Sequence, residues 1–138
     1  MEILKEKYHE ALQCLQKALL IKEKHQGINH SDIPILYNNI GLVHQHARRF
    51  DLALENFQQA LNIYQTLSHE QNQDYAITLE YIGHVLEQME HWTNALSSLK
   101  EAASIYRQVL SSEHPKVTEL EQDIQHISVL INKHTTSE

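Results

Sequence analysis

The chain of 138 residues has the length of one domain, and 41% of its residues are hydrophobic, which excludes global disorder. Eighteen acidic residues against eleven basic ones give a net charge of -7, which argues against a nucleic-acid partner held mainly by phosphate contacts. No apolar run approaches the roughly 18 residues of a membrane span, and the N-terminus lacks a signal-peptide layout. Together with a single cysteine, these features lead us to expect a cytoplasmic protein.

Residues of the same type recur every 42 positions, so the chain holds about 3.3 copies of one unit. The matching sets are Ala11, Ala53 and Ala95; Ala18, Ala60 and Ala102; Leu12, Leu54 and Leu96; Gly41 and Gly83; and the aromatic row Tyr8, Phe50 and Trp92. So many matches at one interval indicate a repeat protein rather than a single irregular fold.

Apolar residues within each unit are three and four positions apart, which is helical spacing. In chain order, the spacing predicts helices over about 2–26, 32–48, 51–68, 74–90, 93–111 and 116–133. Ser31 or Asp32 is expected to cap the helix that begins near Pro34, and Asp74 the corresponding helix one period later. Asp51 and Thr93 occupy matching cap positions for the second helix of each pair.

The pattern Tyr37-x2-Ile40-Gly41-x2-His44, followed by Ala53-x3-Phe57 and Ala60, resembles the tetratricopeptide repeat (TPR), and a second copy follows one period later. The long period is similar to that of kinesin light chains and related adaptor proteins. The resemblance implies an all-α, TPR-type helical-hairpin solenoid, a right-handed superhelix that we expect to contain five helices. It implies one TPR domain over 1–134: residues 1–29 form the second helix of an incomplete repeat, 30–71 and 72–113 form repeats, and 114–134 form a terminal capping helix. Residues 135–138 are expected to be a frayed C-terminus.

Small residues at fixed positions are expected to let the helices approach closely. Gly41 and Gly83 remove the side chain at the crossing of a pair, and alanines meet that crossing or make room for the next pair. The expected packing residues are Gly41, Gly83, Ala53, Ala60, Ala95 and Ala102. The third copy has Gln125 where glycine is expected, which suits a solvated terminal helix.

In the resembled family, the first helix of each pair lines a concave groove that binds peptides. Mapping the groove positions implies Asn38, Asn39, Leu42, His46, Ile77, Glu80, Tyr81, His84, Glu87, Gln122, Asp123 and His126. Asn39 resembles the groove asparagine that bonds a peptide backbone, although a solvated polar face is an equal alternative. The mapped positions contain acids and no Lys or Arg, so we expect a neutral or basic segment with apolar anchors to bind in preference to an acidic C-terminal tail.

Eleven histidines raise the question of metal binding, but their spacing forms no normal ligand set, and we expect no metal and no cofactor. A pH response and surface histidines with ordinary pKa values remain alternatives. Known catalytic motifs are absent from the sequence, so we expect a protein that is not an enzyme.

The sequence therefore predicts a non-catalytic adaptor or scaffold that binds a peptide or helix of a partner protein. The alternatives are a self-assembling element, whose unpaired terminal helix docks on another copy, and a regulatory repeat array of a larger signalling protein. The broken repeat phase at the first helix leaves two explanations, a fragment of a longer array or pairing with another copy.

Overall fold

The computed structural model describes residues 2–27, 31–68 and 72–136, and these residues form six α-helices and no strand. The helices are α1 (Glu2–Gln26), α2 (Ile33–His46), α3 (Phe50–Thr66), α4 (Gln73–Gln88), α5 (Trp92–Val109) and α6 (Pro115–Thr136). The expected number of five is wrong, because the first helix, two complete pairs and a terminal helix make six. The chain divides into two compact units, residues 1–69 and 70–138.

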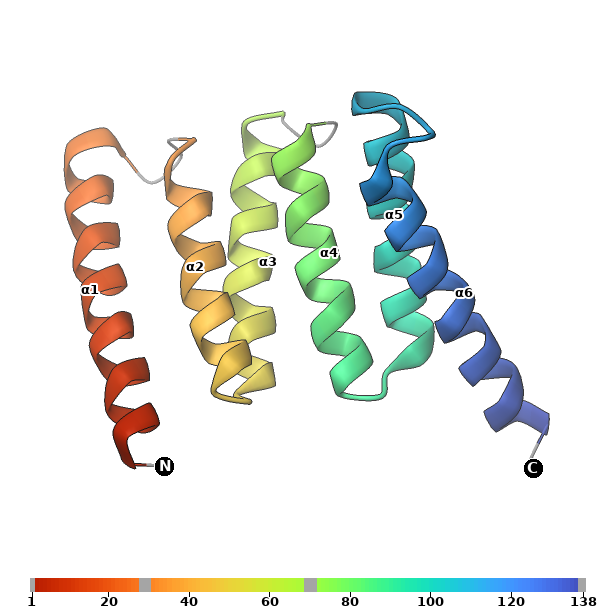
Figure 1. Ribbon diagram of the computed structural model, residues 1–138. Coiled ribbons are helices and arrows are strands. Elements are labelled where there is room, and N and C mark those ends of the chain that lie inside the picture. The colour runs from red at the N-terminus through yellow and green to blue at the C-terminus, as the bar shows by residue number, and fades with distance from the viewer. Residues whose placement is uncertain (1, 28–30, 69–71, 137–138) are drawn as a thin grey trace. The chain divides into compact units, whose positions relative to one another are not determined.

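In the first unit, α2 packs against both α1 and α3 (Figure 1). Gly41 on α2 faces the ring of Phe57 on α3, and both residues are buried. A Cβ atom on Gly41 would lie 2.5 Å from Cε1 of Phe57, closer than carbon atoms can pack. The bare backbone at Gly41 is therefore what allows the large Phe57 ring to fill the space between the two helices.

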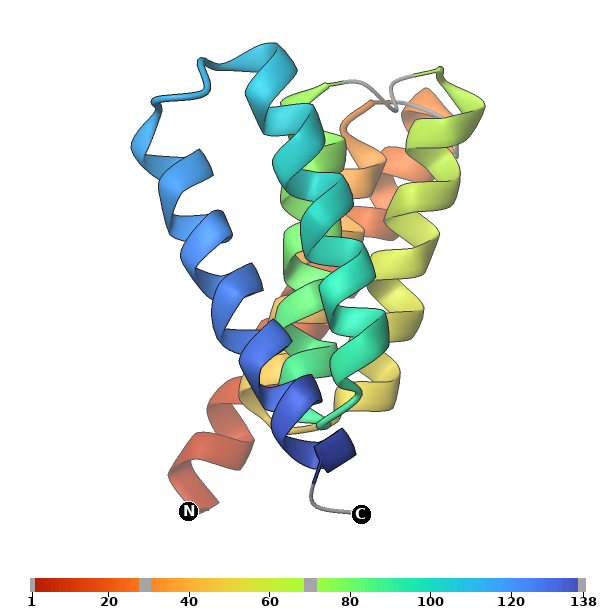
Figure 2. The same ribbon diagram turned by 90° about the vertical axis from the view of Figure 1, so that its right-hand side faces the viewer.

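The second unit repeats this packing one period later, with α5 against both α4 and α6 (Figure 2). Gly83 on α4 faces Leu99 on α5, whose Cδ2 would lie 2.6 Å from an added Cβ. Leu99 is fully buried, as are Ala95 and Ala102 on the same helix. Small residues thus stand at the crossing of α4 and α5, as they do at the crossing of α2 and α3.

Tight turns that contain no glycine end α2 and α4. Arg48 and Glu90, one period apart, adopt left-handed backbone conformations with φ of 63° and 64°. The amides that follow them, those of Arg49 and His91, donate back to the carbonyls of His44 and Leu86 at 2.8 and 2.9 Å. This is the Schellman pattern, which satisfies the last carbonyls of a helix and reverses the chain within a few residues.

The expected caps are only partly correct. Asp32 stands at the N-cap of α2, without a side-chain cap bond, and a proline follows in the first turn. At α4 the cap is Asn72 rather than Asp74, because Oδ1 of Asn72 accepts the amide of Tyr75 at 3.0 Å. At α3 and α5 the helix begins before the expected caps Asp51 and Thr93, and the N-cap residues are Arg49 and His91.

Helix α6 extends to Thr136, so residues 135 and 136 are helical rather than frayed, and residues 137–138 lie outside the described part. The hydroxyl of Thr135 donates to the carbonyl of Ile131. Within the described ranges, no helix has the length and apolar character needed to cross a membrane.

Candidate functional site

A buried carboxylate joins the three helices of the second unit. Glu80 on α4 is 6% exposed. Its Oε1 accepts the hydroxyl of Tyr106 on α5 at 3.1 Å, and its Oε2 accepts Nζ of Lys116 on α6 at 2.8 Å. Burial alone would raise the pKa of Glu80, but hydrogen bonds from His84 and Lys116 outweigh that effect and lower it. Glu80 is therefore an ionised, paired residue that fastens α4 to α5 and α6.

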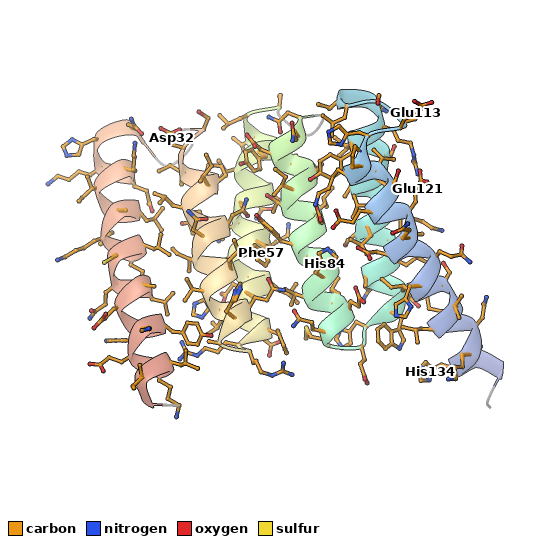
Figure 3. All side chains as sticks on the ribbon, viewed as in Figure 1. Asp32, Phe57, His84, Glu113, Glu121 and His134 are labelled. Carbon is orange, nitrogen blue, oxygen red and sulfur yellow. The ribbon has the colours of Figure 1, made fainter. Side chains whose placement is uncertain are left out.

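His84, which is labelled on α4 in Figure 3, lies one turn along this helix from Glu80. Three carboxylates lie close to its ring. Its Nε2 is 3.5 Å from Oε2 of Glu80 and 4.0 Å from Oδ2 of Asp123, and its Nδ1 is 3.7 Å from Oε1 of Glu87. The hydrogen bond with Glu80 raises the pKa of His84 in spite of partial burial. The imidazole therefore gains a proton more readily here than in water, and its protonation reduces the negative charge of this surface.

A cavity of about 360 Å³ opens beside Glu80, between α4, α5 and the start of α6. It is lined by Gln73, Ile77, Glu80, Tyr81, Tyr106, Leu110, His114 and Lys116. Apolar and aromatic side chains supply much of this lining, with one buried ion pair among them. Such a cavity is suited to an apolar or aromatic side chain, and its polar groups can orient what enters.

The structure brings together most of the groove residues that were predicted in the second unit. Ile77, Glu80 and Tyr81 line the cavity, whereas His84, Glu87 and Asp123 form the acidic surface next to it. Gln122 and His126 are exposed on α6. Glu80 differs from the prediction, because its side chain is buried and paired rather than open to a ligand.

Lys116 is a site residue that the sequence reasoning missed. The expected groove contained no Lys or Arg, yet Lys116 contacts Glu80 and lines the cavity. A signal was present in the repeat, because Lys116 stands where the two earlier copies have Asp32 and Asp74. This reversal of charge at one repeat position marks the ion pair of Lys116 with Glu80, whereas Asp32 at the same repeat position pairs with Lys22 at 3.4 Å.

The predicted groove residues of the first unit do not form a comparable set. Asn38 is 7% exposed, so little of its side chain is open to a ligand, whereas Asn39 is exposed. Leu42 is half-buried. His46 is exposed, and its Nδ1 lies 2.7 Å from the carbonyl oxygen of Leu42. A carbonyl only accepts, so Nδ1 of His46 carries the proton in this contact.

His44 is a second titratable residue, which belongs to the repeat pattern but was not among the predicted groove residues. It is 7% exposed on α2, and its Nδ1 has no hydrogen-bond partner among the residues that the structure describes. Burial lowers the pKa of His44, and the charge of Arg49 lowers it further. The neutral imidazole is therefore the form that the first unit accommodates.

A larger cavity of about 560 Å³ lies at the other end of the second unit, where the turn between α4 and α5 meets the end of α6. The rings of Trp92 and His134 stack beside it, with centroids 6.3 Å apart and planes inclined by 17°. The expected aromatic row marked Trp92, but nothing in the repeat pattern indicated that α6 reaches far enough to supply His134.

The histidines that the structure describes do not gather into a metal site. Within residues 2–27, 31–68 and 72–136, the structure contains no group of three or more His, Cys, Asp or Glu side chains arranged to hold a metal ion. The carboxylates around His84 serve it as acceptors, so the cluster is an ion-pair network.

Comparisons with known proteins agree with the repeat pattern. Two family models described as tetratricopeptide repeat match residues 1–66 and 76–116, together well over half of the chain. A search of curated protein sequences gives no match.

Solved structures show the same fold. The nearly identical TPR-like repeats of kinesin-light-chain type from Podosopora anserina superpose with a TM-score of 0.77 at 15% identity, over 89% of this chain and 58% of that one. BtubC (BKLC) from P. vanneervenii superposes with a TM-score of 0.72 at 16% identity, over 95% of this chain and 56% of that one. This chain thus spans little more than half the length of either structure. The repeat models and the all-helical structure together show that the chain belongs to the tetratricopeptide-repeat family and has the TPR-like solenoid fold of kinesin-light-chain repeats.

Proposed function

We propose that this chain is a non-catalytic module that binds a segment of a partner protein on the face of the second unit formed by α4 and α6. TPR repeats generally mediate protein–protein interaction, which supports a protein partner. The observation that carries the proposal is the cavity of about 360 Å³, which has a partly apolar lining and an acidic surface beside it. One side chain of the partner enters this cavity, next to Tyr81, and its neighbours in the segment lie along the acidic surface.

The charge of this face selects the partner. Lys116 neutralises Glu80 inside the cavity. Outside the cavity, Glu87 and Asp123 both lie near His84. Protonated His84 carries one positive charge against their two negative charges, so the surface keeps a net negative charge. A basic or neutral segment with an apolar anchor is therefore favoured, and an acidic tail meets like charge.

A groove along α2 that uses Asn39, Leu42 and His46 remains a prediction, as do the right-handed superhelix and a cytoplasmic location. The exposed amide of Asn39 supports a contact with a peptide backbone. No ligand-binding role is proposed for Asn38, because it is buried.

The test is a peptide array probed with the purified chain, followed by titration of the best peptide by fluorescence anisotropy. Basic peptides with an aromatic or aliphatic anchor should be enriched. Tyr81→Ala should weaken binding at least tenfold, since it removes a wall of the cavity. Glu87→Lys should weaken binding and reduce its dependence on salt.

A matched control is Glu101→Lys, which makes the same charge change on an exposed residue of α5 that does not line the cavity. This variant should bind the peptide as the wild type does. Enrichment of acidic peptides, or unchanged affinity of Tyr81→Ala with an intact circular dichroism spectrum, would refute the proposal.

Self-assembly is the second candidate function, and a specific observation favours it. Ile3 and Ile21 on α1 are 69% and 57% exposed, although both are large apolar residues. A regulatory role within a larger signalling protein stays a prediction without a supporting contact.

A further inference from the structure

Helix α1 leaves exposed a face that its counterparts bury. One period later, Leu15 corresponds to Phe57 and then to Leu99, which are both fully buried against the helix that precedes them. Leu15 itself is only half-buried. Helix α1 packs against α2 through another side, where the hydroxyl of Tyr8 donates to the carbonyl of His46 at 3.0 Å. The face that α3 and α5 cover is therefore open on α1.

The open face carries a stripe that is apolar except for Lys7. Its residues follow the three-and-four spacing of one helix face, and they are Ile3, Leu4, Lys7, Ala11, Cys14, Ala18 and Ile21, hereafter the α1 stripe. Ile3, Leu4 and Ile21 are 69%, 49% and 57% exposed, and Cys14 is exposed. Small residues occupy the middle of the stripe and large ones its ends, which lets a second helix approach closely at the centre. The stem of Lys7 can cover apolar surface while its ammonium group stays in water.

The stripe is longer than the surface that a TPR first helix would cover. Helices α3 and α5 begin at Phe50 and Trp92, two residues after the left-handed turn residues Arg48 and Glu90. The counterpart of these turn residues in α1 is Glu6, which lies within the helix. Helix α1 therefore continues straight where the other repeats reverse direction, and the added turn carries Ile3 and Leu4. The tight reversal that brings a first helix onto α3 or α5 is absent from α1.

Helix α6 of a second copy is a poor occupant. By repeat position α6 is a first helix, but it carries exposed Gln125 where α2 and α4 have glycine. A single Cβ at Gly41 or Gly83 would already lie 2.5–2.6 Å from the side chain opposite, so a glutamine there prevents close packing against Leu15.

Charge favours another copy of α1 in antiparallel orientation. Along one edge of the stripe, Glu6 and Glu10 precede its centre, and Lys17 and Lys24 follow it. An antiparallel pair places Glu10 near Lys17 and Glu6 near Lys24 of the other copy, and both pairings centre the two helices close to Cys14.

We propose that two copies of this chain associate through their α1 stripes, antiparallel, about a two-fold axis that passes close to Cys14. The contact is isologous, so each copy offers the same surface and the assembly closes as a dimer. This inference gives a surface and a geometry to the self-assembly candidate, and it does not depend on peptide binding by α4 and α6.

Light scattering after size exclusion, over a series of protein concentrations, gives the first test. The wild type should form a dimer at micromolar concentration, and Ile21→Glu should raise the dissociation constant at least tenfold. The matched control is Leu20→Glu, because Leu20 is 68% exposed but lies off the stripe. It should leave the dimer intact. A wild type that is monomeric throughout the series, or a dimer that Leu20→Glu weakens as much as Ile21→Glu, would overturn the proposal.

The orientation has its own test. Since Cys14 is the single cysteine, a short bismaleimide can link two copies only through this residue. The wild type should cross-link and Ile21→Glu should not. Glu10→Lys should weaken the dimer, and Lys17→Glu added to it should restore the dimer. Failure of this rescue, or dimers that do not cross-link, would overturn the antiparallel geometry. Because the stripe lies on α1 and the cavity is lined by residues of the second unit, Ile21→Glu should keep the peptide affinity of the wild type. This result separates the two proposals.

Discussion

Replacing Gly83 by alanine tests whether helix packing or helix propensity decides the stability of the second unit. The added Cβ would lie 2.6 Å from Cδ2 and 2.7 Å from Cγ of Leu99. Carbon atoms normally approach to about 3.5–4.0 Å, so either contact needs a shift of about 1 Å. Cδ2 can move with a rotation of the side chain, but Cγ moves only with the stem of a fully buried residue. Leu99 or the whole of α5 must therefore give way.

Two opposing terms set the size of the effect. Alanine is better than glycine in a helix by about 1 kcal/mol. Overpacking a filled core costs about 1–3 kcal/mol, and contacts this short put Gly83→Ala near the upper value. The net loss in the free energy of unfolding should be about 2 kcal/mol, roughly a thirtyfold fall in the ratio of folded to unfolded chains.

Urea denaturation followed by the fluorescence of Trp92 measures this loss, since Trp92 is the single tryptophan and begins α5. A double-mutant cycle with Leu99→Ala identifies the cause. Leu99→Ala alone should cost about 2–5 kcal/mol. The double variant should lose about 3 kcal/mol less than the sum of the two single losses, because the new Cβ enters the space that Leu99 leaves and the overpacking cost disappears. If Gly83→Ala is as stable as the wild type, or if the two losses simply add, the close approach of α4 and α5 is not what requires glycine.

Four further predictions concern helix ends and histidines. Asn72→Ala should destabilise the second unit by about 1 kcal/mol in the same assay, whereas Asn72→Ser should retain most of the stability, because a hydroxyl can still cap α4. Glu90→Gly should raise the melting temperature, with a gain of about 0.5–1 kcal/mol, because glycine adopts φ of 64° without strain; a lower melting temperature would contradict this account of the turn. The pKa of His84 is raised by Glu80, so its stabilisation of the second unit should be complete below pH 6.5 and disappear as the pH rises through the folded value; His84→Gln should remove this slope from denaturation curves measured between pH 5.5 and 8. The pKa of His44 is lowered by burial, so the first unit should instead lose stability as the pH falls below 6.5, and this loss should be absent in a His44→Gln variant that folds.

The helices were predictable because two independent patterns agree. Apolar spacing gives the helical faces, and the 42-residue period repeats them, so each predicted range except the last helix's C-terminus lies within about two residues of the observed helix. The ends were less predictable. Arg48 and Glu90 take up a conformation that usually requires glycine, and neither residue type signals it.

Side-chain pairing in the second unit was less accessible to sequence reasoning. The period indicates that α4, α5 and α6 are neighbours, but it carries no information about which rotamers meet. Glu80 bonds to residues 26 and 36 positions away, and both contacts depend on how deeply α4 is covered. The exchange of Asp74 for Lys116 one period later was the one sign that an ion pair forms here.

The repeat position of Glu80 explains why two predicted groove residues are buried. Its counterparts one period away are Asn38 and Gln122. Asn38 and Glu80 are both buried, and in each case a second helix follows that carries a buried tyrosine at the same repeat position, Tyr64 or Tyr106. Gln122 has no such helix after it among the described residues, and it is exposed. Coverage by the second helix thus decides whether a polar side chain at this position packs inside the repeat or faces solvent. The acids that remain to meet a partner are Glu87 on α4 and Asp123 on α6, beside His84.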